Sequence, residues 1–417
     1  MAADSAPFVA PAPRGVLAWH ICGAVLQSAG GAVLWILPLL VRKQFGADDW
    51  LTFLITVTPA VLFSVSIFWH ELFDRWSIAR ALTVYWLIGV VPLGVCGWAR
   101  EYWQLFIGYF IACTGAAAWS PIQGALMRRL YDSRTRGRAF GLINGAGLLG
   151  VMLSAWFIGA WLERSTESFR VFMPLIAVIQ GVGIGILALI ALRHAPFPPT
   201  AAREREPILR RITQPLLRMR EVLKADPVFF RYERAFMTYG IGWMICNALL
   251  PILADRNLHF TYAQYAHATQ VFTQIGNIAM AYPLGRLLDR IGAVRLSSLS
   301  FAALALYPLG LLFSRNSVDV AIVSLVYGAC MAGVQHGWLL GPVALAGSAE
   351  KAPTYVAIHT TLVGIRGIVA QGLGMMIYRA TGSITAPMVI AAAAFLHSAW
   401  QMRQLRAATA DRLALVR

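Results

Sequence analysis

The stretch Leu72-Phe73-Asp74-Arg75 returns 215 positions later as Leu287-Leu288-Asp289-Arg290. In the same way, Pro92-Leu93-Gly94 returns as Pro308-Leu309-Gly310 at an offset of 216. A nearly constant offset is typical of a chain that was doubled and then gained short insertions. The sequence therefore predicts two homologous halves.

Both halves consist mainly of apolar runs. Hydrophobic residues fill 58% of the 417 positions and charged residues 13%, whereas a soluble protein carries about 25% charged residues. A run of about 20 apolar residues crosses the hydrocarbon core as a helix. Twelve such runs occur, at 15–41, 49–70, 79–98, 102–127, 138–162, 169–192, 232–254, 262–285, 296–314, 318–345, 354–378 and 383–402. We therefore predict an all-α integral membrane protein with twelve transmembrane helices in two pseudo-symmetric six-helix bundles.

One long hydrophilic interval, 194–231, separates the two predicted bundles. Its apolar residues between Ile208 and Leu223 recur at spacings of three or four among arginines, which predicts a basic amphipathic helix on the lipid surface. This helix is either a tether between the bundles or a docking element for a partner. The predicted parts are a tail at 1–14, a bundle at 15–193, the linker at 194–231, a bundle at 232–402 and a tail at 403–417.

The basic residues indicate the orientation of the spans. With the N-terminus in the cytoplasm, most of the 35 Lys and Arg residues fall in cytoplasmic segments, as the positive-inside rule requires. We expect both termini to be cytoplasmic and the chain to lie in a bacterial inner membrane. Because the arginines are distributed as topology signals, the net charge of +16 does not predict binding to nucleic acid.

The stretch from Gly285 to Gly292, Gly-Arg-Leu-Leu-Asp-Arg-Ile-Gly, resembles the loop signature of the major facilitator superfamily. That pattern is Gly, three residues, Asp, Arg, one residue and Gly, followed by basic residues. Here it falls between the eighth and ninth predicted spans. In the first half Asp74-Arg75 remain, but His70 and Ser77 replace the two glycines. Twelve spans, a central linker and the repeat extend the resemblance over nearly the whole chain.

The resemblance implies a gating role for the two loops. Asp74 with Arg75, and Asp289 with Arg290, are expected to hold the cytoplasmic side closed while the outer side is open, and Gly285 and Gly292 complete the motif. An acid beside a helix N-terminus gains roughly 0.3–1 kcal/mol from the helix dipole. The alternative is that these arginines serve as topology signals only.

Arg366 is an unusual charged residue because it falls near the centre of the eleventh span. A charge at that depth costs about 2.5–3.5 kcal/mol on insertion scales, so it should face a cavity or a partner. Glu233 and Asp255 come closest among the acids, but both are expected at span ends, and no carboxylate is expected at the depth of Arg366. Arg366 therefore either recognises an anionic solute or is a structural, hydrogen-bonded arginine.

Polar residues concentrate in the spans that line or flank the central cavity in the superfamily. This implied substrate-binding set contains Gln27, Trp119, Gln123, Tyr239, Trp243, Asn247, Gln270, Gln274, Asn277, Gln335, Trp338 and Arg366. Amides in lipid also hydrogen-bond between helices, which is the alternative interpretation of each one. Together, the midplane tryptophans and Arg366 predict an organic solute with apolar surface and one acidic group.

Coupling to an ion is less clearly marked in the sequence. His336 and His359 lie within spans and belong to the residue type that titrates near neutral pH, so they are the candidate proton carriers. No acid partner is expected for His359. The alternatives are histidines that only pack and hydrogen-bond, combined with uniport or with exchange of two anions.

The sequence thus predicts a secondary transporter that moves a small organic solute, with a preference for anions, by alternating access of its halves. The alternatives are efflux of amphipathic compounds and a non-transporting assembly factor or sensor on the same fold. No enzyme motif, cofactor site or metal-ligand spacing is evident. We expect a monomer in the lipid bilayer, with the solute and candidate protons as partners.

Overall fold

The computed structural model describes residues 14–64, 76–131, 133–195, 217, 219–347 and 351–414. Each predicted span is helical over most of its described residues, and this part of the chain contains no strand. Nine helical segments within it are long and apolar enough to cross a membrane. The second span is the shorter helix Asp49–Ser64, while the eighth and twelfth are helical but fall outside these nine. Asp74, Arg75 and most of the linker lie outside the described residues.

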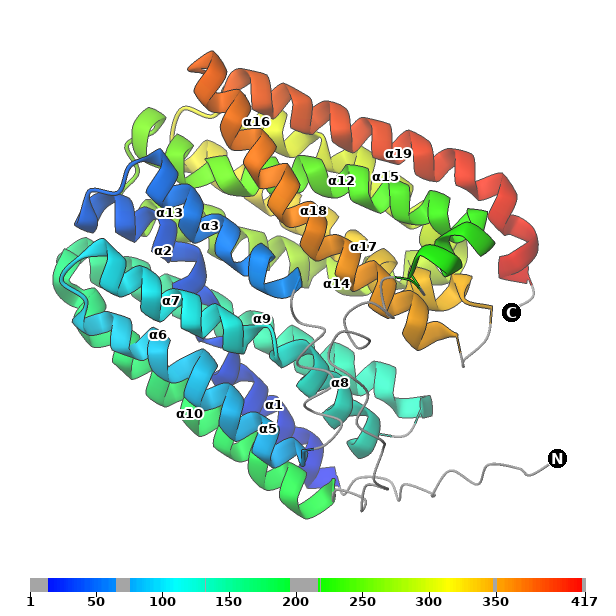
Figure 1. Cartoon of the computed structure of the whole chain (residues 1–417), viewed down its shortest axis with the longest axis horizontal. Coiled ribbons are helices and arrows are strands. Elements are labelled where there is room, and N and C mark those ends of the chain that lie inside the picture. The colour runs from blue at the N-terminus through cyan, green and yellow to red at the C-terminus, as the bar shows by residue number, and fades with distance from the viewer. Residues whose placement is uncertain are drawn as a thin grey trace. The chain divides into compact units, whose positions relative to one another are not determined.

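The chain divides into two compact units, each of which packs mainly against itself. Unit 1 comprises 1–47 and 65–200, and unit 2 comprises 48–64 and 201–417. The predicted first bundle, 15–193, contains α3 (Asp49–Ser64) by position. In the structure, however, this helix belongs to unit 2, where it packs on α18 (Ala352–Thr381) (Figure 1). The domain boundaries therefore stay a prediction.

Unit 1 is built on helices that correspond to five predicted spans. Its described elements are α1 (Arg14–Ser28), α2 (Gly30–Phe45), α5 (Ile78–Tyr85), η1 (Trp86–Val90), α6 (Val91–Val95), η2 (Cys96–Trp98), α7 (Tyr102–Ala116), α8 (Trp119–Leu130), α9 (Ser133–Arg164), η3 (Thr166–Ser168) and α10 (Phe169–His194). The third span is irregular: η1 is a π-helical turn that ends at Val90, and Pro92, which has no N–H to donate, lies two residues after it.

Unit 2 contains the remaining helices (Figure 1). They are α3, α12 (Pro227–Ile252), η4 (Leu253–Asn257), α13 (Tyr262–Tyr265), η5 (Ala266–Val271), α14 (Phe272–Ile291), α15 (Ala293–Leu304), α16 (Leu306–Phe313), α17 (Ser317–Leu345), α18 and α19 (Thr385–Ala414). Helix α12 begins early because Asp226 accepts hydrogen bonds from the N–H groups of Val228 and Phe229, both at 3.1 Å. Pro227 follows as the first helical residue.

Small residues let the helices of each unit pack closely, as expected in lipid. In unit 2, a Cβ on Gly328 of α17 would lie 1.9 Å from the carbonyl oxygen of Thr273 of α14. In unit 1, a Cβ on Gly183 of α10 would lie 2.7 Å from the carbonyl oxygen of Gly23 of α1. These glycines are therefore fixed by the close approach of two helix backbones.

The loop motif between α14 and α15 also depends on a glycine. Gly292 has φ 79° and ψ 163°, a conformation that L side chains rarely adopt. Its N–H donates to the carbonyl of Leu288 at 2.8 Å and so ends α14. The second motif glycine is thus required by the turn itself.

Candidate functional site

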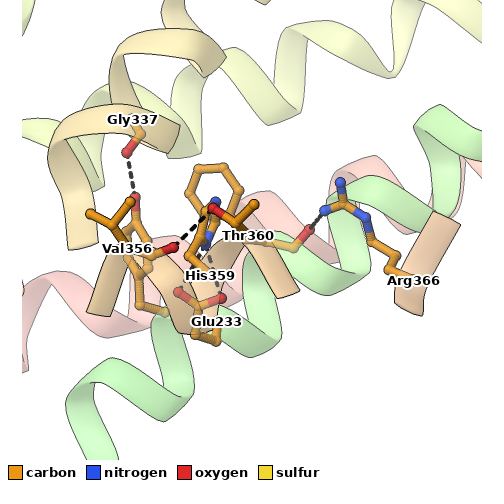
Figure 2. Close-up of polar contacts among 8 residues, drawn as sticks. Glu233, Gly337, Val356, His359, Thr360 and Arg366 are labelled. Atoms are coloured by element: carbon orange, nitrogen blue, oxygen red, sulfur yellow. Dashed lines mark hydrogen bonds and ion pairs between the residues drawn. The ribbon is translucent and has the colours of Figure 1, made fainter. Parts of the chain in front are cut away.

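A buried, hydrogen-bonded pair of a histidine and a glutamate joins α12 to α18 inside unit 2. The Nδ1 atom of His359 lies 2.9 Å from both carboxylate oxygens of Glu233, and Figure 2 shows the imidazole above that carboxylate. The two residues are 1% and 2% exposed. The expectation that His359 lacks an acid partner is therefore wrong. Because α12 begins at Pro227, Glu233 lies inside the helix and not at its end.

The hydrogen bonding defines where this histidine can take up a proton. An ionised carboxylate only accepts, so Nδ1 carries a hydrogen and donates it to Glu233. In the neutral imidazole Nε2 is then the bare acceptor, and it is buried without a hydrogen-bond partner among the described residues. The ring packs edge-on to Phe236, with centroids 5.0 Å apart, and to Trp338, at 5.5 Å. Nε2 is therefore the atom that a proton would occupy.

Arg366 lies seven residues after His359 on the same helix, and it is 6% exposed. One of its terminal N–H groups donates to the carbonyl of Phe236 on α12 at 2.7 Å (Figure 2). Its Cζ is 5.5 Å from the ring centroid of Tyr239, within cation–π range. Nε of Arg366 has no hydrogen-bond partner among the described residues.

The backbone of α12 leaves space for this guanidinium. A Cβ on Gly240 would lie 2.0 Å from both Cζ and Nε of Arg366, so any side chain at position 240 would displace the guanidinium from its present place. Arg366 thus has the contacts expected of a structural, hydrogen-bonded arginine, while its Nε–H has no acceptor among the described residues.

Glu233, His359 and Arg366 form a charge-balanced cluster. With a neutral imidazole, the carboxylate and the guanidinium sum to zero, which limits the cost of burying them. Uptake of one proton at Nε2 raises the sum to +1. In a weakly screened interior a net positive charge favours an anion nearby.

Aromatic side chains of α12 extend from this cluster. Tyr239 stacks on Phe301 with centroids 4.6 Å apart and lies parallel to Trp243 at 6.4 Å. The indole N–H of Trp243 donates to the Tyr327 hydroxyl at 2.7 Å, and that ring stacks on Tyr307 at 4.2 Å. Two predicted site residues, Tyr239 and Trp243, therefore belong to one aromatic layer next to Arg366.

The predicted amides of the eighth span are buried. Gln270, Gln274 and Asn277 are 6%, 9% and 4% exposed, and Oε1 of each glutamine has no hydrogen-bond partner in the described chain. Asn247 on α12 is half-buried, whereas Gln335 on α17 is exposed. The membership of these amides in one binding site with the Glu233–His359–Arg366 cluster stays a prediction.

Unit 1 contains the other predicted site residues. Gln27 donates to the Tyr85 hydroxyl at 2.9 Å, and the ring of Tyr85 packs on Trp119 with centroids 5.4 Å apart. Gln180 donates to the backbone carbonyl of Gln27 at 2.7 Å. Gln123 is half-buried on α8. The structure thus brings Gln27 and Trp119 together through Tyr85, which the sequence analysis did not single out.

The second loop motif, for which a gating role stays a prediction, lies at the end of α14. Asp289 and Arg290 are exposed there, and Gly285 and Gly292 are partly buried. His336 of α17 donates from Nδ1 to the carbonyl of Ala332 at 2.5 Å, and its Nε2 would be 3.4 Å from a Cβ on Gly285. Asp74 and Arg75 lie outside the described residues, so only the second motif is placed.

A second polar cluster in unit 2 was not predicted. Arg256 contacts the buried carboxylate of Asp49 at 2.9 Å and donates to the Tyr378 hydroxyl at 3.1 Å. It joins α3, η4 and α18 at the end of α12 that is farther from Glu233. Asp49 stands at the start of its span, a position at which acids usually face water, so sequence alone gave no signal of its burial.

Comparison with known proteins places this chain in a family. A sequence model of the Major Facilitator Superfamily matches residues 20–378. The multidrug resistance protein MdtH of Photorhabdus laumondii is 22% identical over 260 residues, which is 61% of this chain and 60% of the length of that relative. The chain thus spans about 60% of the length of this curated protein.

Solved structures share the fold. A POT family transporter in complex with 5-aminolevulinic acid superposes with a TM-score of 0.76 at 13% identity, over 95% of this chain and 97% of that one. The nucleoside transporter NupG superposes with a TM-score of 0.68 at 14% identity, over 96% and 100% of the two chains. At such identities the likeness concerns the fold alone.

Proposed function

We propose that this chain, which belongs to the Major Facilitator Superfamily, moves a small organic anion across the membrane together with a proton. The observation that carries the proposal is the buried cluster of Glu233, His359 and Arg366. Its charge is balanced only while Nε2 of His359 is bare. A protonated cluster has one excess positive charge, and a carboxylate on the solute removes that excess.

Each residue has a defined part in this proposal. Glu233 accepts the hydrogen on Nδ1 of His359 and so fixes the tautomer in which Nε2 is bare. Arg366 supplies a permanent positive charge, with Nε left to donate to an incoming carboxylate. An anion beside a protonated Nε2 accepts the hydrogen that would otherwise lack an acceptor. Proton and anion therefore stabilise one another in the site.

Trp338 and the aromatic layer of α12 support an apolar or aromatic body for the solute. Trp338 packs against the histidine ring, and Tyr239 packs beneath the guanidinium. Flat apolar surface of this kind binds the non-polar part of an aromatic or branched carboxylate. Aromatic monocarboxylates are accordingly the substrate class that we expect first.

The test is uptake by purified protein in liposomes under an inward proton gradient. The panel contains aromatic monocarboxylates, aliphatic dicarboxylates and amphipathic cations. We expect gradient-driven accumulation of a carboxylate that is lost in Glu233→Gln and His359→Gln. The control is His397→Asn, because His397 is exposed on α19 and hydrogen-bonded to Gln401 of its own helix.

Efflux of amphipathic compounds is the second candidate function. The layer formed by Tyr239, Trp243 and Tyr327 favours it, as does the similarity to a multidrug resistance protein. Under that function Arg366 would only hold α18 against α12. The two functions separate in the same assay, since gradient-driven movement of cations that survives in Arg366→Gln would support efflux.

A further inference from the structure

An apolar groove runs along unit 1 between the third span and α10. It has a volume of about 660 Å³ and lies between residues 83–98 and 174–188. Glycine and alanine form much of its lining, through Gly94, Ala177, Gly181, Gly185 and Ala188. The indole of Trp86 lies across Gly181, whose Cβ would be 2.7 Å from Nε1. The groove thus forms where small side chains lie beside the large indole of Trp86.

The irregular backbone of the third span contributes to this shape. Trp86 begins the π-helical turn that ends at Val90, and Pro92 lies two residues further on. Beyond the turn the two helices approach closely, since a Cβ on Gly94 would be 2.6 Å from the Cβ of Ala177. At Gly185, by contrast, nothing lies within 4 Å of an added Cβ.

The chemistry of the lining fits hydrocarbon. The one hydroxyl in it belongs to Thr83, and that hydroxyl already donates to the carbonyl of Ala79 at 3.0 Å. Apart from Thr83, the large exposed side chains along it are apolar or aromatic and include Val95, Val178 and Val182. Both walls belong to segments that cross the membrane by length and hydropathy. The groove therefore opens among lipid chains and not toward water.

Its length fits an acyl chain. From Thr83 to Trp98 a helical rise of about 1.5 Å per residue gives the groove a length of about 22 Å. One leaflet of the hydrocarbon core is about 15 Å thick, so the groove is long enough for an acyl chain that crosses one leaflet. At one end stand Trp98, which is 65% exposed, and the exposed Arg100. Tryptophan and arginine are the residues that meet headgroups at the membrane interface. Arg170 of α10 is anchored beside them, since it donates to the carbonyl of Ala99 at 3.1 Å.

We propose that this groove is a lipid site, in which one acyl chain of a bilayer phospholipid lies along residues 83–98 while its phosphate meets Arg100. The guanidinium of Arg100 provides the charge that a phosphate requires. This site is independent of the Glu233–His359–Arg366 cluster, because it lies wholly within unit 1.

The experiment uses the full chain in liposomes that contain a phosphatidylglycerol with a diazirine on its acyl chain. After irradiation, labelled peptides are mapped by mass spectrometry. We expect labelling concentrated on residues 83–98 and 174–188. Gly185→Leu places an apolar side chain in the groove, where its Cβ meets nothing within 4 Å, and should reduce labelling there to the level of the exposed face of α19. The matched control is Gly372→Leu, a helical glycine of α18 whose Cβ also meets nothing within 4 Å.

Two further variants keep the test decisive. Ala188→Leu narrows the same groove and replaces Gly185→Leu if the latter fails to fold. Arg100→Gln should weaken labelling while leaving its position unchanged. Labelling spread evenly over all exposed helices and unaltered by the groove variants would overturn the proposal. So would a dimer in the membrane that Gly185→Leu dissolves, because a second copy would then be the occupant.

Discussion

The imidazole Nδ1 of His359 lies 2.9 Å from both carboxylate oxygens of Glu233, although the residues are 126 positions apart. The pair connects the seventh span to the eleventh within unit 2, and Arg366 balances its charge. A proton at Nε2 leaves this buried cluster positively charged. That relationship underlies the proposed coupling of proton and anion.

The first prediction separates the stability of the pair from its function. Glu233→Gln alone should lower the free energy of unfolding by about 3–5 kcal/mol, because it leaves the buried guanidinium of Arg366 without the carboxylate that balances its charge. The triple variant Glu233→Leu/His359→Leu/Arg366→Leu should be much less destabilised, since apolar replacement of all the charged partners of a buried cluster is often neutral. Thermal unfolding in detergent measures both effects.

The same triple variant should be inactive in proton-driven uptake despite its stability. If it instead accumulated solute under a proton gradient as the parent does, the pair would have only a structural role.

The second prediction concerns the space that Gly240 leaves for Arg366. Gly240→Ala should destabilise the protein by about 1–3 kcal/mol, the usual cost of overpacking, because its Cβ would meet the guanidinium at 2.0 Å. In an Arg366→Ala background the same change should cost far less. A double-mutant cycle of melting temperatures checks this, and Gly372→Ala serves as the control because its Cβ meets nothing within 4 Å. Strict additivity of the two changes would contradict the assigned contact.

The third prediction concerns Arg256. Asp49→Asn should cost about 1.5–3 kcal/mol, as expected for a hydrogen bond to a charged group, whereas Tyr378→Phe should cost about 0.5–1.5 kcal/mol. Asp49 carries the larger effect because its carboxylate is buried and Arg256 is its ion-pair partner. Arg379→Gln is the comparison, since Arg379 is exposed and faces the Trp50 ring at 5.7 Å. Equal losses in all three variants would argue against the ion pair.

The fourth prediction distinguishes the two glycines of the α14–α15 motif. Gly292→Ala should cost about 1–3 kcal/mol because its backbone lies in a region that L residues rarely adopt. Gly285→Ala should cost less, because the nearest atom to its Cβ is Nε2 of His336 at 3.4 Å and that side chain can shift. Chemical unfolding of the two variants and the parent shows directly which substitution lowers the free energy of unfolding more. A larger loss at Gly285 would reverse this assignment.

The helical fold followed from the sequence because a lipid environment permits few alternatives. Apolar length alone marks a span, since backbone groups in hydrocarbon must be satisfied within the helix. The repeat and the Gly285–Gly292 stretch then indicated the family, which the match over 20–378 confirms.

The candidate site was harder to predict because it depends on where α12 begins. The apolar run at 232–254 placed Glu233 at a span end. The cap at Asp226 and the proline after it start the helix earlier, so Glu233 lies inside it. Its contact with His359 also depends on how α12 packs on α18, which a single sequence does not show. The π-helical turn at Trp86 and the hydrogen bond from Gln180 to Gln27 are tertiary features of the same kind.

The most direct test of the central claim is to record proton flux and anion flux together in liposomes. An internal pH-sensitive dye reports protons, and a radiolabelled aromatic carboxylate reports the anion, with the anion gradient as the only driving force. We predict that inward movement of the anion acidifies the interior, and that His359→Gln abolishes the acidification. Anion uptake with no change of internal pH in the parent protein, or acidification that persists in His359→Gln, would contradict the account.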